Sequence, residues 1–334
     1  MNARKNVIRA AAALALGTGL GTAYALQRTF VRRWQASADE LTNAGLSMPA
    51  NLLHHFVITD DGGRIHVVEA GRGPAIVLVH GVTLSVGVWA RQFRDLSGTH
   101  RVIALSLRGH GQSIGGSGGY SFERLADDLV TVLERLEVTG AVVVGHSMGG
   151  MVVQLAALRR REALHRHVAG LVLLATDAGP AIPGPVGRPV GVATTRVAWG
   201  AARFAERRGK GLSFGSDDLA TWATRACFGA HPRATDVELA RSISTTVTPR
   251  AMAELLGPLL DFDVRAELSE IDFPTLVVVG TRDVITPARR SRDVAARILG
   301  ARLEVLPGCG HLVMLERPTA LDALLEGFSA ELSA

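Results

Sequence analysis

Short, uninterrupted apolar runs alternate with helix-like segments along most of this chain. The runs are four or five residues long and lie at 75–79, 102–105, 141–144, 171–174 and 276–279, with a further one at 303–306. Strands that are buried on both faces of a parallel sheet have this composition. A hairpin around an Asp-Asp-Gly-Gly turn at 60–63 is expected before the first run. The alternation predicts right-handed crossovers and therefore a doubly wound α/β sheet.

One long interval interrupts the alternation. About a hundred residues separate the run 171–174 from the run 276–279, and a structureless loop of that length is implausible in a compact domain. After a Gly- and Pro-rich start, the interval has helical patterns near 192–208, 217–228, 235–246 and 249–260. We predict a helical cap over 179–262, above the carboxyl edge of the sheet, where open α/β sheets bind ligands. The core is then expected over 55–178 and 263–334.

Residues 145–149 read Gly-His-Ser-Met-Gly, a G-x-S-x-G pattern between the run 141–144 and a helical segment. In such a strand–turn–helix elbow the serine has a strained backbone and exposes its hydroxyl. Small residues two positions before and after the serine keep the tight turn free of collisions. The helix that follows directs its N-terminal dipole at developing negative charge. We predict that Ser147 is a nucleophile.

A serine hydroxyl needs a base, and the base needs a carboxylate that fixes its tautomer. His311 follows the run 303–306, in a loop that can carry an imidazole over the elbow. Asp283 directly follows the run 276–279 and is the expected carboxylate, with Asp177 as its rival. The chain order Ser147, Asp283, His311 is that of one known type of Ser-His-Asp triad.

Two backbone amides are expected to stabilise an oxyanion. The amide of Met148 directly follows the predicted nucleophile. The second donor is expected in the loop after the run 75–79, at Val82, which follows His80-Gly81.

Together these motifs resemble the α/β-hydrolase family, in the serine-nucleophile branch with a His-Gly oxyanion loop, which includes esterases, lipases and haloperoxidases. The resemblance runs from about residue 55 to the C-terminus. It adds Trp89 after His80-Gly81, Leu-Arg-Gly-His-Gly-Gln-Ser at 107–113, and Glu316 and Pro318 after His311. Ser106 stands where many relatives carry Asp, so a local change in hydrogen bonding is expected there, without loss of activity.

The resemblance implies a mostly parallel eight-stranded sheet with an inserted helical cap. It also implies a serine hydrolase that cleaves carboxylic esters through an acyl-enzyme, with no cofactor and no metal. Relatives that open epoxides or remove halides use an Asp nucleophile, so a serine at position 147 argues against both reactions. The Ser-Met-Gly-Gly sequence at 147–150 keeps cofactor-free haloperoxidase or perhydrolase activity open. Carbon–carbon bond or prolyl peptide hydrolysis, and binding of a small ligand without turnover, are further alternatives.

The positive charge is concentrated at the N-terminus. The chain has a formal charge of +5, yet residues 1–33 hold six basic residues and no acidic one, so the remainder carries −1. The remainder has no basic stripe interleaved with aromatic residues, which argues against a nucleic-acid partner. Its two cysteines, Cys227 and Cys309, exclude a disulfide scaffold and are expected to be free thiols.

Residues 1–33 are predicted to be a membrane anchor or signal segment, followed by a linker over 34–54. Residues 10–26 carry no charge, and as a helix they span about 26 Å, slightly less than the bilayer core. Extension to 7–27 approaches a full span. Ala23-Tyr24-Ala25 has the form of a cleavage site, so secretion after cleavage near Ala25 is the alternative. An apolar tail on a soluble protein is the third reading. A single-pass anchor favours an apolar or lipid-like ester as substrate.

Overall fold

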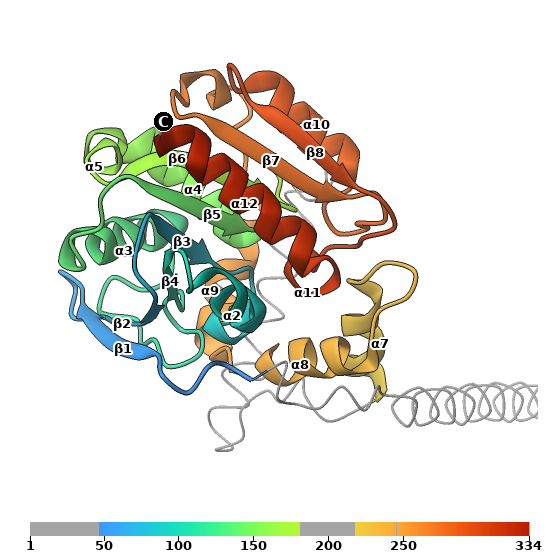
Figure 1. The fold of residues 1–334 in the computed structure, drawn as a ribbon. Helices are drawn as coiled ribbons and strands as arrows, with labels where there is room; N and C mark the ends of the chain where they lie inside the picture. The colour runs from blue at the N-terminus through green and yellow to red at the C-terminus, as the bar shows by residue number, and fades with distance from the viewer. Residues whose placement is uncertain (1–46, 181–217, 245, 334) are drawn as a thin grey trace, which may run out of the picture.

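The computed structural model describes residues 47–180, 218–244 and 246–333, which form an α/β domain around one sheet (Figure 1). The sheet has eight strands in the order β1-β2-β4-β3-β5-β6-β7-β8. The bounds are β1 Leu53–Ile58, β2 Arg64–Ala70, β3 Ala75–Val79, β4 Arg101–Leu105, β5 Ala141–His146, β6 Val168–Leu174, β7 Thr275–Gly280 and β8 Arg302–Leu306. Strand β2 pairs antiparallel with both of its neighbours, whereas β3 to β8 are parallel. The predicted mostly parallel sheet is therefore confirmed.

Helices cover both faces of this sheet. The helical elements before the long insertion are η2 Val86–Trp89, α2 Ala90–Leu96, α3 Phe122–Arg135, α4 Met148–Arg159 and α5 Arg161–His165. Those from the insertion onward are α7 Asp218–Ala226, α8 Ala234–Ser244, α9 Pro249–Asp261, η3 Leu268–Glu270, α10 Ala288–Arg297, α11 Val313–Glu316 and α12 Pro318–Ser333.

The side chains of the central strands alternate between two apolar layers. In β3, Val77 and Val79 pack with residues of α3 and α4, while Ile76 and Leu78 pack with residues of α2 and α12. All five residues of β3 are buried. This burial on both faces explains the uninterrupted apolar runs, because a strand with only one covered face alternates apolar and polar residues.

Three helices of the insertion between β6 and β7 are described: α7, α8 and α9. They agree with the helical patterns predicted near 217–228, 235–246 and 249–260. In Figure 1, α7 and α8 lie together beyond the end of the sheet, and α8 contacts η2. The helix predicted near 192–208 lies outside the described residues.

Strand β1 begins at Leu53, inside the range 34–54 that the sequence analysis assigned to a linker. The strand extends further than predicted because its register with β2 starts at Leu53 opposite Glu69. The predicted anchor over 1–33, with its span at 7–27 and the cleavage site near Ala25, lies outside the described residues. Within 47–180, 218–244 and 246–333, no helix is long and apolar enough to cross a membrane.

Candidate active site

Ser147 occupies the turn between β5 and α4 with a left-handed backbone, at φ 52° and ψ −120°. Hydrogen bonds to β6 and the segment after it hold this turn: the Ser147 amide donates to the Leu174 carbonyl, and Thr176 Oγ1 donates to the Ser147 carbonyl at 2.7 Å. A Cβ at Gly149 would lie 2.4 Å from the Val79 carbonyl oxygen, so only glycine fits there. The predicted elbow is therefore present, and its packing against two strands maintains the strained serine.

His311 and Asp283 are brought together by two loops at the carboxyl edge of the sheet. His311 Nδ1 lies 2.9 Å from Asp283 Oδ2. The other carboxylate oxygen, Oδ1, accepts the amides of Ile285 and Thr286, each at 2.8 Å. Thr286 Oγ1 donates to Asp283 Oδ2 at 2.7 Å. The carboxylate is thus fixed on both oxygens, and its remaining interaction is with the imidazole.

The surroundings of Asp283 favour its charged form. Burial raises the pKa of Asp283, but hydrogen bonds from His311 and Thr286 outweigh it, so that the pKa lies below the ordinary value. An ionised carboxylate accepts a proton-bearing Nδ1, which leaves Nε2 of His311 as the nitrogen available to act as a base.

Asp177, the rival acid, has different partners. Its carboxylate forms an ion pair with Arg290 and accepts the amides of Ala178 and Gly179. These bonds connect the end of β6 to α10. The geometry therefore favours Asp283 over Asp177 as the partner of His311.

His146, the residue before Ser147, contacts the His311 loop. Its Nε2 lies 3.0 Å from the His311 carbonyl oxygen, and the two ring centroids are 4.8 Å apart. Burial and the neighbouring His311 lower the pKa of His146 to about 3, so the ring is neutral at pH 7. The neutral ring donates its Nε2 proton to that carbonyl and links the elbow to the histidine loop.

The loop at 80–84 is fixed by the side chain of His80. The Leu107 amide donates to His80 Nε2 at 2.9 Å, so Nδ1 carries the proton and donates to the Gly81 carbonyl at 2.7 Å. Burial, with His110 and His146 nearby, holds the pKa of His80 well below its ordinary value. In the described turns and loops, no backbone hydrogen bond uses the amide of Val82 or Met148 as donor. Neither predicted oxyanion amide is thus engaged by a backbone acceptor from the described turns and loops.

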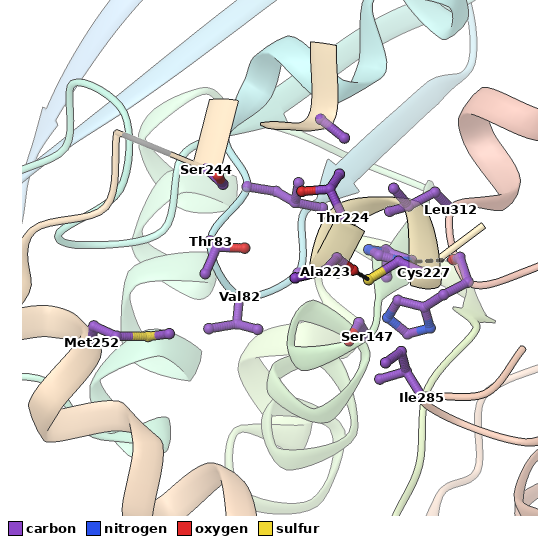
Figure 2. A pocket seen from close by; sticks show the side chains of 15 residues that line it. Val82, Thr83, Ser147, Ala223, Thr224, Cys227, Ser244, Met252, Ile285 and Leu312 are labelled. Carbon is purple, nitrogen blue, oxygen red and sulfur yellow. Dashed lines mark hydrogen bonds between the residues drawn. The ribbon is translucent and has the colours of Figure 1, made fainter. Parts of the chain in front are cut away.

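Ser147 and His311 line one cavity of about 310 Å³ between the sheet edge and helices α7, α8 and α9. Figure 2 shows Val82 and Met252 on one side of Ser147, and Leu312 and Ile285 on the other. None of the described lining residues is Asp, Glu, Lys or Arg. Ser147 is buried, with only 8% of its surface exposed. The described part of the cavity lining is therefore largely apolar and carries no acidic residue and no Lys or Arg.

Two lining residues were not singled out by the sequence analysis as part of the site. Thr83 has φ 62°, a left-handed conformation that is rare for a β-branched residue, and lies next to Val82. Cys227 lines the cavity as a free thiol, and Cys309 is free and buried. Burial raises the pKa of Cys227 to about 11, so this thiol is protonated at neutral pH. The strained backbone of Thr83 could not be predicted from the sequence, because threonine rarely adopts a left-handed conformation.

The loop after β4 shows how Ser106 is accommodated. Its hydroxyl lies 3.4 Å from the Val86 amide, and its carbonyl accepts the Ser113 hydroxyl at 2.6 Å. Next to it, the buried Arg108 binds Asp128 through two hydrogen bonds of 2.6 Å and also contacts Asp61. The Leu-Arg-Gly motif is therefore structural, since it connects the first hairpin turn to α3.

This fold and site define a class, the α/β hydrolases. The chain belongs to the alpha/beta hydrolase fold family, whose model matches residues 74–318. It is 28% identical over 276 residues to the AB hydrolase superfamily protein YisY of Bacillus subtilis, covering 82% of this chain and 98% of that protein.

Two solved structures illustrate the similarity. A thermophilic esterase from Thermogutta terrifontis is 27% identical, with a TM-score of 0.69. The match covers 85% of this chain and 100% of the esterase. Est816, described as an N-acyl homoserine lactone degrading enzyme, is 29% identical, with a TM-score of 0.66 over 82% of this chain and 100% of its own.

Proposed function

We propose that this protein hydrolyses uncharged carboxylic esters with apolar acyl groups through a Ser147–His311–Asp283 triad and an acyl-enzyme. One observation carries the proposal: a histidine hydrogen-bonded to a fixed carboxylate lines the same apolar cavity as a serine held in a strained elbow. Strained backbone of this kind persists where the surrounding structure enforces it, and it concentrates at functional sites.

In the proposed reaction, Ser147 Oγ attacks the ester carbonyl while His311 Nε2 takes the hydroxyl proton. Asp283 stabilises the imidazolium that forms, and the amides of Val82 and Met148 donate to the oxyanion. The carbon–oxygen bond to the alcohol then breaks, and His311 returns the proton to the departing alcohol. Water, deprotonated by His311, then attacks the acyl carbon. The bond from this carbon to Ser147 Oγ breaks, His311 returns the proton to Ser147 Oγ, and the carboxylic acid is released.

The lining of the cavity supports the substrate class. A charged group would lose its hydration there without gaining a charged partner among the described lining residues. The names of the similar structures, an esterase and a lactone-degrading enzyme, are consistent with open-chain or cyclic esters. Small neutral esters are therefore the first substrates to test, followed by lactones and lipid-like esters.

A nitrophenyl ester series from acetate to laurate, with Ser147→Ala as the control, tests the activity. We expect hydrolysis by the wild type, and a decrease in kcat of at least about 10⁴-fold in the variant, because no other group replaces the nucleophile. A fluorophosphonate should label Ser147 in the folded protein. A folded wild type that is neither labelled nor active would leave only the ligand-binding alternative. Peracid formation from acetate and hydrogen peroxide would instead indicate perhydrolase activity.

The choice of acid is tested by Asp283→Asn with Asp177→Asn as its matched control. An amide at position 283 presents a donor to His311 Nδ1 and favours the wrong imidazole tautomer, so kcat should decrease about 10⁴-fold. The change at Asp177 removes an ion pair at the end of β6 and should leave kcat within about tenfold, because Asp177 does not contact the imidazole in this arrangement. Equal losses in the two variants would contradict the assignment.

A further inference from the structure

The loop that carries His311 is packed main chain against main chain on a turn of the insertion. The His311 amide donates to the Cys227 carbonyl at 2.7 Å, just after the end of α7. A Cβ at Gly310 would lie 2.4 Å from the Gly229 nitrogen, so the two backbones are in direct contact. Residues 227–229 are called the cap turn below. The position of His311 is thus tied to the position of the cap turn.

A single carboxylate binds both segments. Glu316, at the end of α11, accepts the Gly310 amide on Oε1 and the Gly229 amide on Oε2, each at 2.8 Å. Burial raises the pKa of Glu316 above its ordinary value, and these two amide bonds offset only part of that increase. Because one oxygen binds the His311 loop and the other binds the cap turn, loss of either hydrogen bond frees one of these two segments from Glu316. In the sequence, Glu316 stands out only as part of the family motif after His311, which assigns it no role.

Arg225 holds the cap turn from the other end. Its guanidinium donates to the Gly229 carbonyl at 2.9 Å and to the Ala230 carbonyl at 3.0 Å. On the opposite side, His146 binds the His311 carbonyl. Both polar groups of the His311 main chain are therefore engaged, the amide by the cap turn and the carbonyl by the elbow that carries Ser147.

We infer that Glu316 is a positioning residue that locks the cap turn to the His311 loop, so that the insertion and the base move as one unit. The inference rests on the proposed function, since it concerns how His311 is held for that reaction. The side chains of Thr224 and Cys227 line the cavity from the same part of the insertion (Figure 2). A substrate that displaces this wall therefore also displaces the base.

The first test compares Glu316→Gln with Glu304→Gln, an exposed glutamate on the edge strand β8. Glutamine keeps one acceptor oxygen and turns an amide donor toward the other backbone N–H. We expect kcat to decrease about tenfold, because a displacement of about 1 Å can cost about 100-fold and this displacement should be smaller. A small fluorophosphonate should label Ser147 more slowly by a similar factor, since it depends on His311 but leaves most of the cavity empty. The Glu304 variant should match the wild type.

A second readout separates positioning from stability. The NMR resonance of the proton between His311 Nδ1 and Asp283 should shift or broaden in Glu316→Gln under conditions where circular dichroism shows a folded protein. If Glu316→Gln does not fold, Arg225→Gln serves as the test, because it loosens the same cap turn. If both fold, their effects on kcat should be less than additive, as expected for residues that act through one contact.

A folded Glu316→Gln with wild-type kcat, labelling rate and resonance would overturn the inference, as would full additivity with Arg225→Gln. Failure of the proposed function has a different signature, because the wild type itself would then show neither hydrolysis nor labelling of Ser147.

Discussion

Ser147 combines a polar side chain with a backbone conformation that most residues avoid. At φ 52° its Cβ crowds the backbone, and such a conformation costs about 1–3 kcal/mol. The surrounding strands maintain it through the Leu174 and Thr176 contacts. The free energy of unfolding is therefore lower than it would be with an unstrained residue at this turn.

Replacing Ser147 with glycine should raise the free energy of unfolding relative to Ser147→Ala. Both variants lack the hydroxyl, but alanine keeps the Cβ that crowds the backbone, while glycine removes it. After allowance for the larger unfolded-state entropy of glycine, we expect a difference of about 1 kcal/mol. Urea denaturation of the two variants measures it. An alanine variant as stable as the glycine variant would contradict the prediction, because the strain would then not exceed the entropy cost of glycine, about 0.5–1 kcal/mol.

The positions of the candidate site residues in the fold were predictable wherever a residue follows an apolar run. Ser147, His311 and Asp283 each follow an apolar run, and a parallel sheet brings the carboxyl ends of such runs together. The contacts of Glu316 with Gly229 were not predictable, because they join backbone amides to a side chain 87 positions away. Main-chain partners of this kind leave no pattern in the sequence.

Among the elements, the central strands β3 to β7 were predicted to within a few residues, because each one contains an uninterrupted apolar run. The start of β1 was missed, since β1 is an edge strand in which only Val57 is fully buried. The packing of α2 on α12 was also not predicted. Here Gln92 Nε2 donates to Asp322 Oδ1 at 3.1 Å, while Asp322 Oδ2 has no hydrogen-bond partner among the residues that the structure describes. A buried carboxylate in an apolar contact gives no periodic signal.

Asp322 is expected to make stability depend on pH. Burial raises its pKa to about 7, from an ordinary value of 3.8. Between these values the folded state binds more protons than the unfolded state, so the free energy of unfolding decreases as pH rises through this window.

Asp322→Asn should therefore stabilise the protein at about pH 8, by up to about 4 kcal/mol, and have little effect at about pH 3, below both pKa values. Thermal unfolding across this range measures the effect, with Glu304→Gln as an exposed control. A variant whose pH dependence parallels that of the wild type would show that Asp322 is not the responsible group.

At the scale of the whole molecule, the charge distribution separates the N-terminus from the rest of the chain. Residues 1–33 carry all of the excess positive charge, and we propose that the segment 7–27 anchors the protein in a membrane. The proposal is supported by the uncharged stretch 10–26 and by the basic residues on both sides of it. An anchored body with an apolar cavity would encounter substrates dissolved in the bilayer.

The anchor is tested by comparing the full chain with one that begins at residue 34. After cell disruption and sedimentation, the full chain should be found with the membranes and the shortened chain in the supernatant, with equal kcat for a small ester. A full chain in the supernatant would contradict the anchor. A mature protein that begins directly after Ala25 would instead establish a cleaved signal peptide.

The insertion is closed at its base, because the Val264 amide donates to the Ala178 carbonyl at 2.8 Å. Because the two ends of the insertion lie side by side, the insertion could be replaced by that of a related protein without interrupting the sheet. Such a replacement would, however, affect the position of His311. Any foreign insert must again offer a carbonyl to the amide of His311, and swaps that omit it would change turnover together with substrate preference.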